Sequence, residues 1–301
     1  MPHWFLSTRA QSVGGPVAAS VSVIDADRRG FPTDLTAELI EAIRGRDILF
    51  VVHGFNVDQN NGIKNLGYWM DTLDIGNAIP IGILWPGDCI LPIFVDYIVE
   101  GSEAIRSGDL LAAFLNRFLT SAASLSFTSH SLGARVVLQT IQGLIPALIV
   151  RSTVLMAGAI DDTCLTDEYK VAAARVTELS LLVSRKDDVL SMAYPLGNPL
   201  QGIIDTGHPY RKAALGREGP DPPNPSAPGL ESDWMIPDVL DYGHLDYIPG
   251  KPIPVKFAQP VNIPPATDPS PPLTTPPELQ PPAKWKPAFS AGFVSTRFQR
   301  P

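Results

Sequence analysis

Residues 124–134 read SLSFTSHSLGA, and within them an apolar strand pattern changes to a helix pattern. We expect a strand at Ser124–Thr128 and a helix from Ala134. A serine on so sharp a turn points its hydroxyl away from the sheet, and the helix N-terminus favours developing negative charge. Gly133 supplies the small residue that the turn requires, and Ser129 replaces the more usual glycine. The pattern predicts Ser131 as a nucleophile rather than a serine that only caps the helix.

The flanking sequence alternates short apolar runs with longer amphipathic stretches. The runs read as buried strands of a mostly parallel sheet. They lie at Ser22–Ile24, Asp47–Val52, Ile79–Trp85, Ser124–Thr128, Ser152–Ala157 and Glu178–Val183. We expect helices within Asp34–Arg44, Asn61–Asp74, Ile93–Leu119, Ala134–Leu148 and Thr166–Ala174. This order predicts an α/β fold, with helices on both faces of a mostly parallel sheet. Too few residues separate Ala157 from Glu178 for a large cap.

Composition narrows the class of protein. The 301 residues are 45% hydrophobic and 18% charged, which suits one large globular core. The net charge of −8 argues against a nucleic-acid partner, because phosphate contacts need a basic surface. Two cysteines, Cys89 and Cys164, do not make a disulfide framework. We see neither a signal peptide in the first 20 residues nor a membrane span, so we expect a cytoplasmic protein.

The C-terminal region differs from the rest of the chain. From Pro249 onward it contains fifteen of the chain's 31 prolines, so we expect it to be extended. We therefore divide the chain into a domain at 1–248 and a Pro-rich segment at 249–301. Aromatic residues such as Trp285 and Phe293 favour a strap docked on the domain, and a flexible tail is the alternative.

A second motif, His53-Gly54-Phe55-Asn56, follows the strand Asp47–Val52. Acyl transfer needs two donors aimed at the developing oxyanion. One would be the backbone amide of Leu132, after the nucleophile. The other would be the amide of Phe55, with Gly54 allowing close approach of the backbone. His53 is better suited to bracing this turn than to acting as a general base.

At this point the sequence resembles the α/β-hydrolase superfamily, in particular a bacterial branch of unassigned function with esterase- and lipase-like members. The resemblance rests on five segments that span residues 47–247: FVVHGFN at 50–56, LWP at 84–86, SHSLGA at 129–134, VSRKDDVL at 183–190 and GHLDY at 243–247. It implies a catalytic triad in the order nucleophile, acid, histidine.

The resemblance assigns the acid to the residues that follow the strand Glu178–Val183. Asp187 aligns best, with Asp188 and Asp161 as alternatives. For the histidine, His244 has the expected position after a final strand that we expect at Met235–Leu240, and His208 is the rival. His244 would act as general base and Asp187 would orient it.

The substrate cleft is expected to involve His53, Gly54, Trp85 and His130. The apolar stretch Ile90–Val95 suggests a small-molecule ester with an apolar acyl or aryl group. These features predict a carboxylic ester hydrolase that forms an acyl-enzyme without metal or organic cofactor. A thioesterase, acyltransferase or amidase with the same triad, and a non-catalytic binding protein of this fold, are the alternatives. The sequence does not specify the oligomeric state.

Overall fold

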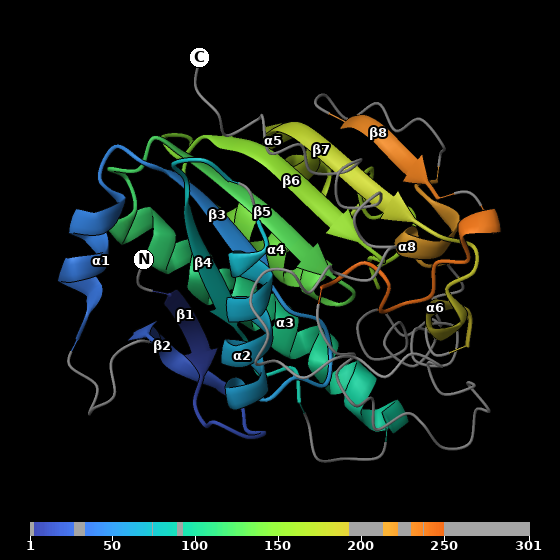
Figure 1. Cartoon of the computed structure of the whole chain (residues 1–301), viewed down its shortest axis with the longest axis horizontal. Helices are drawn as coiled ribbons and strands as arrows, with labels where there is room; N and C mark the ends of the chain where they lie inside the picture. The colour runs from blue at the N-terminus through green and yellow to red at the C-terminus, as the bar shows by residue number, and fades with distance from the viewer. Residues whose placement is uncertain are drawn as a thin grey trace.

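The computed structural model describes residues 3–26, 34–73, 75–88, 93–192, 213–221, 230–236 and 238–249. In these residues an eight-stranded sheet has the order β2-β1-β4-β3-β5-β6-β7-β8. Only the β1–β2 pair is antiparallel, and each of the other neighbours pairs in parallel. Figure 1 shows the sheet crossing the molecule with helices in front of it and behind it. The expected α/β architecture, a mostly parallel sheet with helices on both faces, is confirmed.

The strands between residues 17 and 183 lie close to those that the sequence predicts. They span Trp4–Arg9 (β1), Val17–Asp25 (β2), Asp47–Val52 (β3), Ile79–Leu84 (β4), Ser124–His130 (β5), Val150–Met156 (β6), Val176–Val183 (β7) and Leu230–Met235 (β8). All six residues of β3 are buried, as expected for a central strand covered on both faces.

Helices cover both faces of the sheet. They span Thr36–Ile43 (α1), Gln59–Asp71 (α2), Ile93–Phe118 (α3), Gly133–Gly143 (α4), Lys170–Arg175 (α5), Asp188–Met192 (α6) and Leu215–Glu218 (α8). Helix α4 packs between α3 and α5 on one face, whereas α2 packs on β3 and β4 (Figure 1). The side chain of Asp58 caps α2 by accepting a hydrogen bond from the amide of Asn61 at 2.9 Å.

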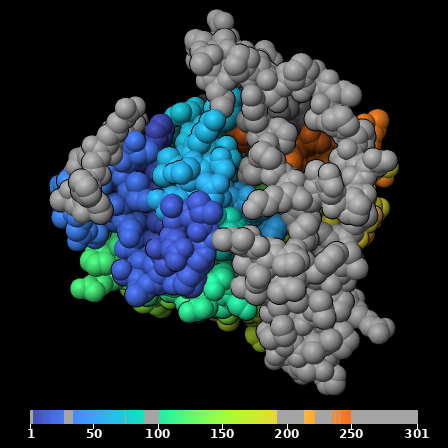
Figure 2. Space-filling view, turned by 90° about the horizontal axis from the view of Figure 1, so that it is seen from below, coloured from blue at the N-terminus to red at the C-terminus, as the bar shows by residue number. Residues whose placement is uncertain are grey.

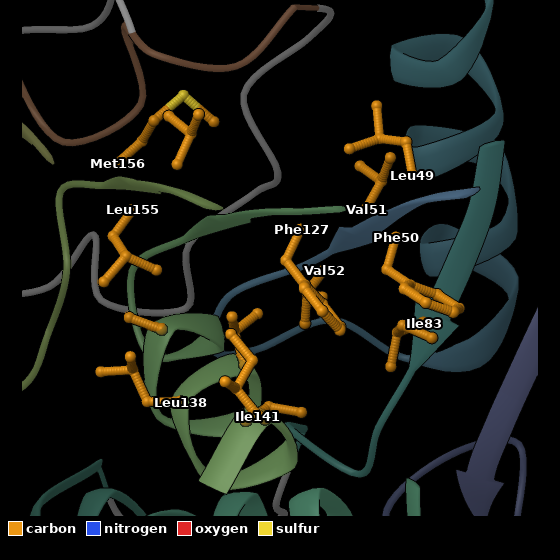
Figure 3. Packing of buried hydrophobic residues seen from close by; sticks show 14 of the residues in the cluster. Leu49, Phe50, Val51, Val52, Ile83, Phe127, Leu138, Ile141, Leu155 and Met156 are labelled. Carbon is orange, nitrogen blue, oxygen red and sulfur yellow. The ribbon is translucent and has the colours of Figure 1, made fainter. Parts of the chain in front are cut away.

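The core under α4 is made by alternate residues of the central strands. Phe50 of β3 stacks on Phe127 of β5 with ring centroids 5.0 Å apart. Figure 3 shows both rings pointing to the side of the sheet where Leu138 and Ile141 of α4 lie. Because side chains alternate along a strand, Leu49 and Val51 point to the other side (Figure 3). The strands that carry the site are thus packed on two faces.

The N-terminus contains a strand that the sequence pattern did not indicate. Trp4–Arg9 forms β1, whose six residues are all buried, although Ser7, Thr8 and Arg9 interrupt its apolar character. The hairpin turn after β1 reaches α2, where the Gln59 amide donates to the Ser12 carbonyl at 2.9 Å. Figure 2 shows these N-terminal residues, in blue, beside the light-blue residues of α2 on the surface.

The prediction of a final strand at Met235–Leu240 is wrong. Strand β8 ends at Met235, and Asp238–Leu240 form a 3₁₀ turn in which Val239 is exposed. Pro237 lacks the amide hydrogen that a continuing strand would donate to its neighbour. Between β6 and β7, residues 157–175 contain only the short helix α5, so the expectation that this connection holds no large cap is confirmed.

Two expectations fall on other parts of the chain. The Pro-rich segment lies, from residue 250, outside the described residues, as does the rival histidine His208. Among the helices that the structure does describe, none combines the length and apolarity needed to span a membrane.

Candidate active site

Ser131 lies on a strained turn between β5 and α4. Its φ angle is 54°, in the left-handed region that a residue with a side chain seldom adopts. The turn is stabilised by its neighbours, because the Ser131 amide donates to the Met156 carbonyl at 2.9 Å and the Ser131 carbonyl accepts from Ala134 and Ala159. Such a turn presents the hydroxyl at the carboxyl edge of the sheet.

Two glycines allow the backbone after β3 to approach this turn. A methyl group on Gly54 would lie 2.9 Å from Cβ of Ser131, and one on Gly133 would lie 2.6 Å from the His53 carbonyl oxygen. Both distances are shorter than real Cβ contacts. The HGFN segment and the serine turn therefore pack against each other without room for side chains at these positions.

The structure brings together the three residues that the sequence suggests as a triad. His244 Nε2 lies 2.8 Å from Ser131 Oγ, and His244 Nδ1 lies 2.7 Å from Asp187 Oδ2. A carboxylate only accepts hydrogen bonds, so Nδ1 carries the proton and Nε2 is left to accept from the serine hydroxyl. This tautomer is the one that a general base for Ser131 requires.

Asp187 rather than Asp188 or Asp161 faces His244. Its side chain is fully buried, and its second oxygen accepts a hydrogen bond from the Leu190 amide at 2.9 Å. Asp188 is exposed at the start of α6, as expected for one of two adjacent acidic residues at a helix N-terminus. Asp161 follows β6 and pairs with Ala214 in a short antiparallel bridge.

Three hydrogen bonds hold the loop that carries His244. The Ser184 hydroxyl, just after β7, donates to the Tyr242 carbonyl at 2.7 Å. The Asp246 carboxylate accepts from the Gly243 amide at 2.8 Å. His130 Nε2 lies 2.6 Å from the His244 carbonyl. The loop is thus attached both to the strand before the acid and to the strand before the nucleophile.

His130 contacts the backbone of His244. His130 is buried, and its ring centroid lies 4.7 Å from the ring centroid of His244. Burial, with a smaller contribution from the nearby His244 ring, lowers the pKa of His130 to about 3. His130 is therefore neutral near pH 7, and because a carbonyl only accepts, its Nε2 carries the hydrogen. This position is that of a support for the His244 loop.

His53 and Trp85 brace each other beneath the HGFN loop. The His53 Nδ1 lies 2.8 Å from the Gly54 carbonyl, and its Nε2 accepts from the Trp85 amide at 3.3 Å. The Trp85 indole donates to the His53 carbonyl at 2.8 Å and stacks on the imidazole. Burial lowers the pKa of His53 to about 3. With both nitrogens engaged, His53 braces the turn, and the indole is fully buried packing rather than an exposed cleft wall.

The two expected oxyanion donors lie on segments that adjoin Ser131. Leu132 begins the turn into α4, and its amide donates to no other described residue. An amide left without an internal partner at a helix N-terminus is suited to bind an anion. Phe55 follows Gly54, which lies against the serine, and its side chain is partly buried against the core.

One set of buried polar residues near this site was not indicated by the sequence. Arg9 at the end of β1 forms an ion pair with Asp88, and both residues are buried. The available signal was a lone arginine at the end of an apolar stretch, which is unusual for a buried segment. No group of three or more His, Cys, Asp or Glu side chains that could hold a metal occurs in the described part of the chain.

The parallel sheet, the strained serine between β5 and α4, and the histidine and aspartate after the later strands define an α/β hydrolase. The chain belongs to the family described as "Alpha/beta hydrolase of unknown function (DUF900)", whose model matches residues 30–220. No curated protein matches the sequence.

Several solved structures resemble this chain. Esterase PE8 is 14% identical, with 67% of this chain and 86% of that chain covered and a TM-score of 0.37. Acetyl xylan esterase 1 from Thermoanaerobacterium sp. JW/SL YS485 is 10% identical, with 85% and 84% covered and a TM-score of 0.38. A structure reported for the metagenome-derived lipolytic enzymes LipS and LipT is 12% identical, with 68% of this chain and 88% of that chain covered and a TM-score of 0.38.

Proposed function

We propose that this protein is a serine hydrolase that cleaves carboxylic esters through an acyl-enzyme at Ser131. The observation that carries the proposal is the hydrogen-bonded series Ser131 Oγ, His244 Nε2, His244 Nδ1 and Asp187 Oδ2, with contacts of 2.8 and 2.7 Å. This series provides a nucleophile, a base and a group that orients the base, which is what nucleophilic acyl transfer requires.

In the acylation step, His244 Nε2 takes the hydroxyl proton as Ser131 Oγ attacks the ester carbonyl carbon. The C=O electrons move to the oxygen, whose negative charge is stabilised by the amides of Leu132 and Phe55. The tetrahedral intermediate collapses, the ester C–O bond breaks, and His244 gives its proton to the departing alkoxide. Asp187 stabilises the imidazolium that exists between these steps.

In the deacylation step, water replaces the alcohol. His244 takes a proton from the water as its oxygen attacks the acyl carbon, and the same two amides stabilise the new oxyanion. Collapse of this intermediate breaks the bond to Ser131 Oγ, and His244 returns the proton to the serine. An acid is released, and each residue regains its starting protonation state.

The substrate that we favour is a small ester with an apolar acyl or aryl group. The support comes from the sequence after Asp88, where Ile90, Leu91 and Pro92 precede Ile93, Phe94 and Val95. Apolar walls beside a triad suit a hydrocarbon group. These residues lie where the structure describes no side chains, so this part of the proposal depends on the sequence alone.

A fluorophosphonate probe tests the nucleophile. Wild-type protein should be labelled and Ser131→Ala should not. Ser126→Ala is the matched control, because it also removes a buried hydroxyl, this one from β5. In the described structure this hydroxyl has no hydrogen-bond partner. Equal labelling of wild type and Ser131→Ala would contradict the proposal.

An acyl-chain series of p-nitrophenyl esters, with thioester and anilide counterparts, tests the substrate class. We expect turnover of the esters, with preference for acyl groups longer than acetyl. Faster turnover of thioesters or anilides would reassign the protein to the corresponding hydrolase class. Labelling without turnover of any of these compounds would favour a binding protein that retains a reactive serine.

A further inference from the structure

Arg9 is a buried cation that binds several groups at once. It ends β1, and its side chain has no exposed surface. Its Nη1 donates to the carbonyls of Val57 at 3.2 Å and Trp85 at 2.8 Å, and its Nε donates to the Gln11 carbonyl at 3.0 Å. Its Nη2 donates to the Asp88 carboxylate.

The partners of Arg9 come from the ends of neighbouring strands. β1, β4 and β3 are adjacent and parallel, so their carboxyl ends lie at one edge of the sheet. Arg9 lies at the end of β1, Trp85 follows β4, and Val57 lies in the loop after β3. Because β5 is parallel to β3, Ser131 lies at the same edge. Arg9 thus joins three strand ends, and the last of these strands, β3, is the neighbour of the strand that leads to Ser131.

The segment between His53 and Val57 is held at both ends. At its start, Trp85 binds the backbone and ring of His53. At its end, Val57 accepts from Arg9 and forms a short antiparallel bridge with Gly87. Asn56 in between has a φ angle of 62° and donates its amide hydrogen to the Gly87 carbonyl. Phe55, the second expected oxyanion donor, lies inside this constrained segment.

The choice of residues at this point favours a positional role over simple packing. Removing a guanidinium and a carboxylate from water is costly, and an apolar pair of similar volume would fill the space without that cost. An apolar pair would not bind carbonyls, whereas a planar guanidinium binds several in fixed directions. Asp88 compensates the charge, and its other oxygen accepts from the Gly14 amide at 3.0 Å.

We infer that Arg9, paired with Asp88, is a positioning residue that fixes the loop 54–57 and thereby the Phe55 amide for the reaction at Ser131. The inference rests on the proposed function. Arg9 touches no reacting atom and acts through the Val57 carbonyl. Displacing an oxyanion donor reduces the stabilisation of the transition state more than it reduces the binding of the substrate. We therefore expect kcat to fall while KM changes little.

The experiment compares Arg9→Lys, Arg9→Gln and Asp88→Asn with wild type. Lysine keeps the charge beside Asp88 but lacks the planar fork that serves three carbonyls and a carboxylate together. Ser124→Ala is the matched control. Its hydroxyl donates to buried Asp47 at 2.7 Å, at the opposite, amino ends of β5 and β3. Steady-state kinetics, the rate of fluorophosphonate labelling, thermal unfolding and hydrogen exchange of residues 53–58 are measured for each variant.

For both Arg9 variants we expect kcat and the labelling rate to fall about tenfold to a hundredfold, with KM within about threefold of wild type. Hydrogen exchange of residues 53–58 should become faster. Asp88→Asn should show the same changes to a smaller degree. Ser124→Ala should lower the melting temperature without changing kcat or exchange in the loop. If Arg9→Gln does not fold, Arg9→Lys and Asp88→Asn decide the question.

Two results would overturn the inference. One is a loss of kcat in the Arg9 variants no greater than in Ser124→Ala at a similar loss of melting temperature. The other is unchanged exchange of residues 53–58 in Arg9→Lys. These differ from failure of the proposed function, in which wild-type protein itself neither reacts with the probe nor cleaves an ester, and which would remove the catalytic part of the inference as well.

Discussion

The imidazole of His130 binds the backbone carbonyl of His244, with 2.6 Å between Nε2 and the oxygen. The residue before the nucleophile is therefore attached directly to the residue that is proposed to activate that nucleophile. His130 lies on β5, and His244 lies on a loop more than a hundred residues later in the chain. This contact ties the loop of the proposed general base to the strand that leads into the serine turn.

Replacing His130 should therefore impair catalysis by displacing His244. His130→Leu removes the donor, and we expect kcat to fall about tenfold or more, since misplacing a catalytic group by an ångström can cost a hundredfold. His130→Gln offers an amide N–H at a similar reach and should retain most activity. Ester kinetics and thermal unfolding check this. Equal losses in the two variants would show that the hydrogen bond has no positioning role.

The two adjacent aspartates should differ sharply. Asp187→Asn keeps the shape but removes the charge that holds Nδ1–H on His244, so kcat should fall by about 10⁴, as in triads where this change selects the wrong tautomer. Asp188→Asn is the matched control, and because its side chain is exposed it should stay within about twofold. The same ester assay with both variants, and with Asp161→Asn, measures this. A dominant loss in either of the other two would reassign the acid.

A single methyl group at Gly54 should disturb the serine. Gly54→Ala would bring Cβ to 2.9 Å from Cβ of Ser131, so one of the two segments must shift. We expect slower fluorophosphonate labelling and lower stability. Gly67→Ala is the control, because it lies in α2 with nothing within 4 Å of the added methyl, and should stabilise the helix by about 0.5–1 kcal/mol. Unchanged labelling of Gly54→Ala would contradict the close packing described above.

The protein should become less stable as the pH is lowered, because His53 and His130 are buried as neutral groups. Burial lowers both pKa values to about 3 in the folded protein, while the unfolded chain has histidines with a pKa near 6.5. Between these two pKa values the unfolded state binds more protons than the folded state. The contribution of the two histidines to stability is therefore complete above about pH 6.5 and is lost as the pH falls towards 3. Each histidine contributes up to about 1.4 kcal/mol per pH unit.

Urea unfolding at several pH values between 7 and 4 measures this dependence. Neighbouring groups also change the pKa of each histidine. The Gly54 carbonyl and Asp58 oppose the lowering at His53, and Arg9 adds to it. The His244 carbonyl and Asp187 oppose it at His130, and the His244 ring adds to it. His130→Gln should reduce the slope, and a slope unchanged by this substitution would show that His130 is not buried as a neutral group.

The local sequence was enough to locate the strands between residues 17 and 183 and the serine turn. The run Asp47–Val52 is uniformly apolar after its first residue, and it becomes β3 with the predicted bounds. Such a pattern is readable because a strand buried on both faces must be apolar throughout. Strand β1 was missed because Ser7, Thr8 and Arg9 are polar, and their burial depends on partners such as Ser107 and Asp88 that only the fold brings near.

The sequence by itself determined the α/β order of elements, the serine between strand and helix, and a short set of acid and histidine candidates. The tertiary structure alone decided that Asp187 and not Asp188 meets His244, because adjacent residues in a loop point in different directions. It also decided that His130 supports the His244 loop and that Arg9 binds the loop after β3. The reason is physical: a sequence pattern encodes what each segment buries locally, whereas hydrogen bonds between distant loops depend on where the packed sheet sets their ends.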